Sequence, residues 1–117
     1  MATEQSSRSR SSRGWSRRAP KSIGQRSAVL SKCGRRCFLG TGKTFPICAR
    51  LDATRASAST MTCKIDRRGV QAAYSRAREW AAITARKKGS SMKAARSHRR
   101  YTAVARRAKA ILSKLKN

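Results

Sequence analysis

Apolar residues in the second half of the chain recur at spacings of three and four, the period of one face of an α-helix. Asp66 can cap such a helix, and Lys87, Lys88 and Gly89 form the usual stop of cations followed by glycine. The pattern predicts an amphipathic helix between these two ends. Its apolar face consists of Val70, Ala73, Tyr74, Ala77, Trp80 and Ala81.

A second helical pattern follows the Gly89-Ser90-Ser91 turn and continues to the C-terminus, with Ser90 or Ser91 as its cap. Because the connection is short, the two helices are predicted to form an antiparallel hairpin. We expect Tyr74 and Trp80 to lie in its seam as core residues rather than as base-stacking platforms. The second apolar stripe consists of Tyr101, Val104, Ala105, Ala108, Ile111, Leu112 and Leu115.

The segment 33–66 has a different character, because glycines and a proline interrupt short apolar pieces. This punctuation favours turns and one short hairpin over helices. Before it, residues 1–32 are rich in Ser, Arg and Gly. So polar a segment is predicted to remain disordered, because it buries too little apolar surface to offset its ordering entropy.

Together these patterns predict a small, mainly α-helical protein with two parts. The first is a disordered basic N-terminal arm, residues 1–32. The second, residues 33–117, combines a loop-rich four-cysteine knot with the C-terminal helical hairpin. A folded part of this size is near the limit at which burial alone stabilises a domain, so a covalent or metal staple is expected.

Four cysteines lie close together at the place where a staple would act: Cys33, Cys37, Cys48 and Cys63. Structural zinc sites usually have two tight pairs of ligands, and only Cys33 and Cys37 are spaced in that way. The spacing therefore favours two disulfides, in any of three pairings, over the alternative of one structural zinc. No other cofactor is expected.

Charge is the most unusual feature of the composition. The 117 residues include 30 Lys and Arg against 4 Asp and Glu, a formal net charge of +26. Such an excess predicts a polyanionic partner, and a nucleic-acid backbone fits best, because cations that neutralise phosphates release condensed counterions regardless of base sequence. Duplex DNA is the favoured form.

The predicted contact residues are cations of the two helices and of the arm. A solvated helix face normally mixes both signs of charge, whereas these faces are almost wholly positive. His98 is expected to be solvated or to face phosphate, and Trp15 to stack on a base or dock on a partner. The predicted nucleic-acid-binding residues are Arg8, Arg10, Arg13, Arg17, Arg18, Arg76, Arg86, Lys87, Lys88, Lys93, Arg96, Arg99, Arg100, Arg106, Arg107 and Lys109.

Catalysis is not expected. The acids Glu4, Asp52, Asp66 and Glu79 are scattered, and a single histidine offers no triad. The run from Gly40 to Thr44 is similar to part of a phosphate-binding loop, but it lacks the first glycine and the following helix. No small-molecule substrate, signal peptide or transmembrane segment is predicted.

Several short motifs from Lys32 onward resemble small basic proteins of large nucleocytoplasmic DNA viruses, notably those that infect algae. The most specific are Cys37-Phe38-Leu39, Phe45-Pro46-Ile47-Cys48 and Cys63-Lys64-Ile65. The resemblance implies a virion protein made in the host cytoplasm. Because such viruses carry their own thiol oxidase, it also implies that disulfides can form there.

The expected function is therefore non-enzymatic, sequence-nonspecific binding and condensation of nucleic acid, as a virion component. One alternative is a minor capsid or cement protein whose basic faces contact other virion proteins or the inner membrane. Another is RNA binding of the ribosomal or splicing type, which the Ser/Arg alternation of the arm suggests.

Overall fold

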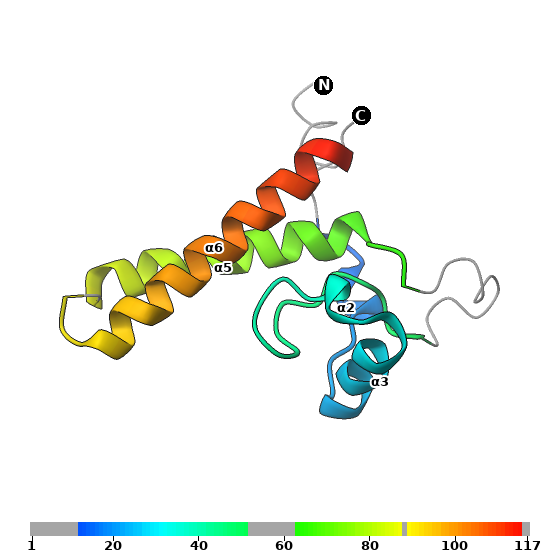
Figure 1. Ribbon diagram of the computed structural model, residues 1–117. Coiled ribbons are helices and arrows are strands. Elements are labelled where there is room, and N and C mark those ends of the chain that lie inside the picture. The colour runs from blue at the N-terminus through cyan, green and yellow to red at the C-terminus, as the bar shows by residue number, and fades with distance from the viewer. Residues whose placement is uncertain (1–11, 52–62, 88, 116–117) are drawn as a thin grey trace, which may run out of the picture.

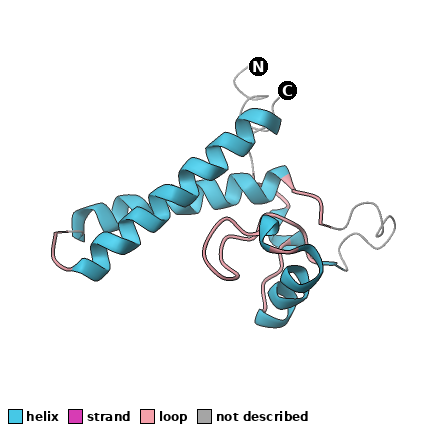
Figure 2. Ribbon diagram, in the orientation of Figure 1, coloured by secondary structure: helices cyan, strands magenta, loops and turns pink. Residues whose placement is uncertain are grey.

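The computed structural model describes residues 12–51, 63–87 and 89–115. Its elements are, in order, α2 (Trp15–Arg18), α3 (Ile23–Cys33), the 3-10 helix η1 (Arg35–Cys37), α5 (Arg67–Lys87) and α6 (Met92–Leu115). Within these residues there is no strand, only two isolated antiparallel bridges (Figure 2). The prediction of a mainly helical protein is confirmed.

Helices α5 and α6 form the predicted antiparallel hairpin, and α6 crosses over α5 (Figure 1). The Ser91 hydroxyl caps α6 by accepting a hydrogen bond of 3.0 Å from the Ala94 backbone N–H. Ala73, Ala77 and Ala108 are buried in the hydrophobic core. Such small side chains allow two helices to approach closely, as the sequence indicates.

The core lies where this hairpin meets α3 and the disulfide-linked loops. Val70 and Val104 of the hairpin share one buried cluster with Val29 of α3 and with Phe38 and Ile47 of the loop. Each of these five side chains is at most 6% exposed. Within the described residues, the hairpin and the loop region therefore fold around one common core.

The prediction that residues 1–32 are a disordered arm is wrong for residues 12–32. Helix α3 extends across the predicted boundary, and its start has a capping box in which Ser22 and Gln25 each bond the other's backbone N–H. Trp15 of α2 is only 8% exposed. The composition of this segment is polar, but its few apolar residues pack into a core that is formed mostly by the rest of the chain. Residues 1–11 lie outside the described residues.

Trp15 is anchored by a close approach to α5, which also corrects its expected role as an exposed stacking group. A Cβ added to Gly69 of α5 would lie 2.7 Å from Cη2 of the Trp15 ring. Only glycine leaves room for the indole at this point. The side chain of Trp15 therefore packs α2 against the first turn of α5.

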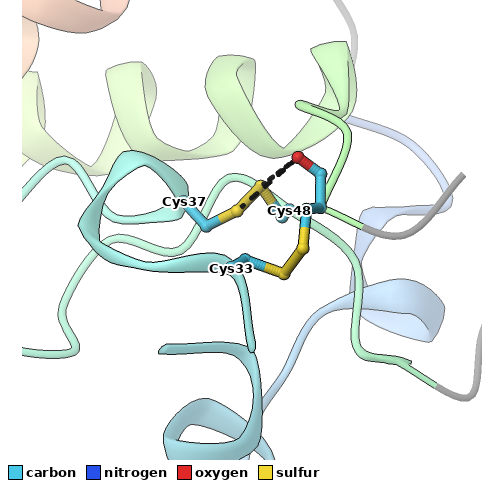
Figure 3. The surroundings of a disulfide bond; sticks show 4 residues. Cys33, Cys37 and Cys48 are labelled. Atoms are coloured by element: carbon cyan, nitrogen blue, oxygen red, sulfur yellow. Dashed lines mark hydrogen bonds between the residues drawn. A yellow bond between two sulfur atoms is a disulfide. The ribbon is translucent and has the colours of Figure 1, made fainter. Parts of the chain in front are cut away.

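Two disulfides join Cys33 to Cys63 and Cys37 to Cys48, with Cα–Cα distances of 5.2 Å each. The second bridge lies inside the loop closed by the first, and Figure 3 shows the two side by side. Cys37 and Cys48 are fully buried, whereas Cys33 and Cys63 are partly exposed. The prediction of disulfides is confirmed, and the structure selects one of the three pairings.

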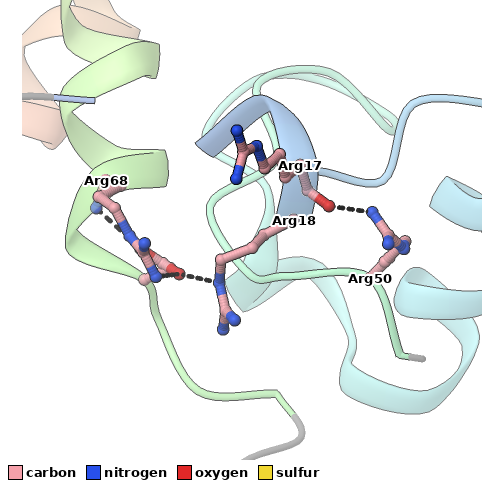
Figure 4. A network of polar contacts seen from close by, with 5 residues as sticks. Arg17, Arg18, Arg50 and Arg68 are labelled. Atoms are coloured by element: carbon pink, nitrogen blue, oxygen red, sulfur yellow. Dashed lines mark hydrogen bonds and ion pairs between the residues drawn. The ribbon is translucent and has the colours of Figure 1, made fainter. Parts of the chain in front are cut away.

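Asp66 joins the N-terminal segment to the start of α5 through Arg18 and Arg68, whose side chains Figure 4 shows. One carboxylate oxygen accepts a hydrogen bond of 2.8 Å from the Arg68 backbone N–H, as a helix cap does, and the other accepts one of 2.9 Å from Arg18 Nε. Partial burial raises the pKa of this carboxyl, but hydrogen bonds from Arg68 and Arg18 lower it more, so the pKa lies below its usual value of 3.8.

Replacing Asp66 by Asn is expected to destabilise the protein by about 1–3 kcal/mol at neutral pH, because two guanidinium groups lose a charged acceptor. A carboxyl with a lowered folded-state pKa contributes stability above its unfolded pKa of about 4 and loses it as the pH falls through the lower folded value. The difference between wild type and D66N should therefore shrink below about pH 4. Urea unfolding from neutral to acidic pH measures it.

Glu79→Gln is the matched control, since Glu79 is an exposed acid on the same helix. It should change the unfolding free energy by less than about 0.5 kcal/mol. An Asp66→Asn effect that stayed constant down to acidic pH would contradict the assigned ion pairs.

Candidate nucleic-acid interface

Helix α6 carries positive charge without any compensating acid. Its 24 residues contain no Asp or Glu. All of its Lys and Arg side chains are exposed. They are Lys93, Arg96, Arg99, Arg100, Arg106, Arg107, Lys109 and Lys114.

Helical geometry places most of these cations outside the apolar stripe that faces the core. Arg96, Arg100, Arg107 and Lys114 follow one another at intervals of four and seven residues, so they lie in one row along the helix. Arg99 and Arg106 lie beside this row. The row is about 27 Å long at a rise of about 1.5 Å per residue, which corresponds to about eight base-pair steps of duplex.

Cations also gather where the hairpin turns. Arg86 and Lys87 end α5, and Lys93 begins α6; all three are exposed. The turn thus extends the positive face of α6 around the end of the hairpin. Lys88, another predicted contact, lies outside the described residues, as do Arg8 and Arg10.

Arg18 and Arg107, which were both predicted as contacts, have partners within the fold. Arg18 forms the ion pair with Asp66. Arg107 donates a hydrogen bond of 2.9 Å to the Leu39 carbonyl oxygen and so ties α6 to the loop. Arg18 is therefore reassigned to fold stability, while exposed Arg107 has further N–H donors for an anion. Arg17 lies on α2 and Arg13 just before it; both are exposed, and neither belongs to a free arm.

His98 does not face solvent as expected. It is half-buried, and its Nδ1 lies 3.0 Å from the Ala81 carbonyl oxygen and 3.3 Å from Thr84 Oγ1, both on α5. The ring links the two helices by a hydrogen bond. Its expected role as a solvated or phosphate-facing side chain is wrong, because its position on α6 faces α5.

Trp80 is also placed differently from the prediction, since its side chain is 42% exposed rather than in the core. It stacks on Tyr101, with ring centroids 6.0 Å apart, and Tyr101 in turn meets the edge of Phe45 at 6.1 Å. These rings line a groove of about 610 Å³ between the hairpin and the N-terminal region. Sequence reasoning missed this groove because its walls come from distant segments.

The loop from Gly40 to Thr44 is a tight hairpin turn. The Gly40 N–H donates to the Thr44 carbonyl oxygen at 3.2 Å, and a Cβ at Gly40 would lie 2.1 Å from Thr44 Oγ1. An antiparallel bridge between Phe38 and Pro46 joins the two sides of the turn, and no helix directly follows it. Its backbone N–H groups therefore do not have the arrangement of a phosphate-binding loop.

All four cysteine sulfurs are paired in disulfides, so in this oxidised state they offer no thiolate ligands to zinc. Across the residues that the structure describes, no group of three or more His, Cys, Asp or Glu side chains gathers as metal ligands would. Among the same residues, none of the helices has an apolar stretch long enough to cross a membrane.

No protein-family model matches this chain, and searches of curated proteins and of solved structures give no significant match. The candidate interface therefore stands on its geometry and charge alone.

Proposed function

We propose that this protein binds nucleic acid without sequence preference and, by neutralising phosphates, condenses it. Helix α6 carries the proposal, since its eight exposed cations and the absence of any acid match a polyanion. Long Arg and Lys side chains contact phosphates, which position a protein on a duplex but do not encode sequence. Duplex DNA is the proposed partner of this face.

A virion is the proposed setting. The sequence motifs resemble those of small basic proteins of large DNA viruses, and disulfides persist in oxidising surroundings such as a virion surface. Stabilisation by two bridges is consistent with a protein that is stored in a particle. The alternative role as a minor capsid protein would use the same basic face against acidic protein surfaces.

The salt dependence of duplex binding tests the proposal. Wild-type protein is expected to bind two unrelated duplex sequences with the same affinity and with a steep, linear fall of log K against log salt concentration. Replacing Arg96, Arg99 and Arg106 by Gln should weaken both complexes equally and reduce the slope by up to about 2.7, at about 0.9 for each lost phosphate contact. Fluorescence anisotropy measures both quantities.

The control replaces Lys32, Arg35 and Arg36 by Gln and so removes the same charge. These exposed residues lie on α3 and η1, outside the hairpin. It should reduce the slope by much less. An equal effect of the two triple variants would contradict the assignment to α6. Failure of the wild type to bind either duplex at low salt, or strong preference for one sequence, would overturn the proposed function.

A further inference from the structure

Aromatic rings and cations line the same groove on the side of the hairpin that faces the N-terminal region. Trp80, Tyr101 and Phe45 form a continuous row of rings along it. Arg76 of α5, Arg100 of α6 and Lys21 at the start of the α3 cap also line it. Arg76, Arg100 and Lys21 are exposed.

From this combination we infer that the groove is a binding site for single-stranded nucleic acid, in which an unpaired base stacks on Trp80 while Arg76, Arg100 and Lys21 contact its flanking phosphates. The inference rests on the proposed function and adds a second surface to it. Base stacking on an aromatic ring within a positive groove is how sequence-tolerant single-strand sites bind.

The size of the groove favours an unpaired base over a duplex. A volume of about 610 Å³ is within the range of about 300–1,000 Å³ that small-molecule sites occupy. A base within a duplex has both faces covered by its neighbours, so it offers none to Trp80, whereas an unpaired base does. The α6 cations outside the groove contact the outside of a duplex, whereas the groove accepts an unpaired base, which a duplex does not present.

The walls of the groove are held together by contacts that do not involve the side chains of Arg76, Arg100 or Lys21. Arg26, which lines the groove, donates from Nε to the Pro20 carbonyl oxygen at 3.1 Å and from Nη1 to the Lys43 carbonyl oxygen at 3.2 Å. These bonds hold the 41–46 turn against the segment before α3. Buried Trp15 forms part of the wall beneath. The site is therefore preformed, which lowers the entropic cost of binding.

The test compares four ligands of similar length: oligo(dT), oligo(rU), the same DNA backbone with abasic sites, and a duplex. Wild-type protein should bind oligo(dT) at least about fivefold more tightly than the abasic strand, since only the former can stack. Trp80→Ala should remove that advantage while changing duplex and abasic binding by less than about twofold. Trp80→Phe should keep most of it. The ratio of oligo(rU) to oligo(dT) affinity shows whether RNA or DNA is preferred.

Arg76→Gln with Arg100→Gln is the second variant, which keeps the test valid if Trp80→Ala loses its fold. It should reduce the salt slope for oligo(dT) by up to about 1.4, at about 0.7 for each single-strand contact, with intrinsic tryptophan quenching still present. Ile83→Ala is the matched control for Trp80→Ala, because Ile83 is an exposed apolar residue of α5 that does not line the groove. It should leave all four affinities unchanged.

Equal wild-type affinity for oligo(dT) and the abasic strand would overturn the groove inference and leave phosphate binding by α6 intact. Equal losses on every ligand in Trp80→Ala, with the fold retained, would do the same. Absence of binding to all four ligands at low salt would overturn the proposed function itself. If an acidic peptide bound at the groove and oligo(dT) did not displace it, the groove would be assigned to a protein partner and the inference would be wrong.

Discussion

Reduction of both disulfides is expected to unfold the protein at physiological temperature. In the loop-closure treatment, a bridge such as Cys33–Cys63, with a sequence separation of 30, stabilises by about 3.7 kcal/mol, and Cys37–Cys48, with a separation of 11, by about 2.8 kcal/mol. A domain of this size has a total stability of only about 5–15 kcal/mol. Circular dichroism during thermal unfolding, with and without reductant, measures the loss.

The two bridges should differ in their order of reduction. Cys33 and Cys63 are partly exposed, whereas Cys37 and Cys48 are fully buried, so a mild reductant should open the outer bridge first. Intact mass of alkylated protein follows each step. Equal thermal stability in oxidised and fully reduced protein would contradict the role of the bridges, and a native mass that retains all four thiol hydrogens would contradict the bridges themselves.

Trp15→Ala is expected to destabilise the protein by about 3–5 kcal/mol, the usual cost of removing a buried aromatic side chain from a core. The indole is only 8% exposed and packs against Gly69, so its removal leaves a cavity between α2 and α5. The same cavity should loosen the contact of Arg18 with Asp66. Urea unfolding measures the change in the free energy of unfolding.

Trp80→Ala is the matched control in the same unfolding measurement, because Trp80 is 42% exposed and its loss opens no buried cavity. It should cost less than about 1 kcal/mol. Gly69→Ala provides a further check: it should be destabilising in the wild type and much better tolerated beside Trp15→Ala, since the clash requires the indole. A cost below about 0.5 kcal/mol for Trp15→Ala would return this segment to the disordered arm that composition predicts.

The prediction succeeded where the relevant contacts are local. Helices α5 and α6 begin and end near the predicted caps and stops, because Asp66, Ser91 and the cations before Gly89 act on the turn beside them. Local signs of α3 were also present: the Ser22 to Gln25 spacing is that of a capping box. The polar composition of residues 1–32 outweighed them, and the helix was missed.

The groove could not be predicted in the same way. Trp80 lies on the apolar stripe of α5, and periodicity gives it the same status as buried Ala77. Its exposure depends on where α2 and the 41–46 turn pack, which is a question of contacts between segments far apart in the sequence. The choice of cysteine pairing has the same cause, since spacing alone allows three arrangements.

By itself, the sequence determined the positive charge, the helical hairpin with its cationic outer face, and the need for a cysteine staple, because composition and helical period are properties of single segments. Tertiary structure decided the burial of Trp15, the pairing of the cysteines, the partners of Arg18 and Arg107, and the exposure of Trp80 beside Tyr101. Each of those depends on which distant segments share the core, and the free energy of that packing is not encoded in any one stretch of chain.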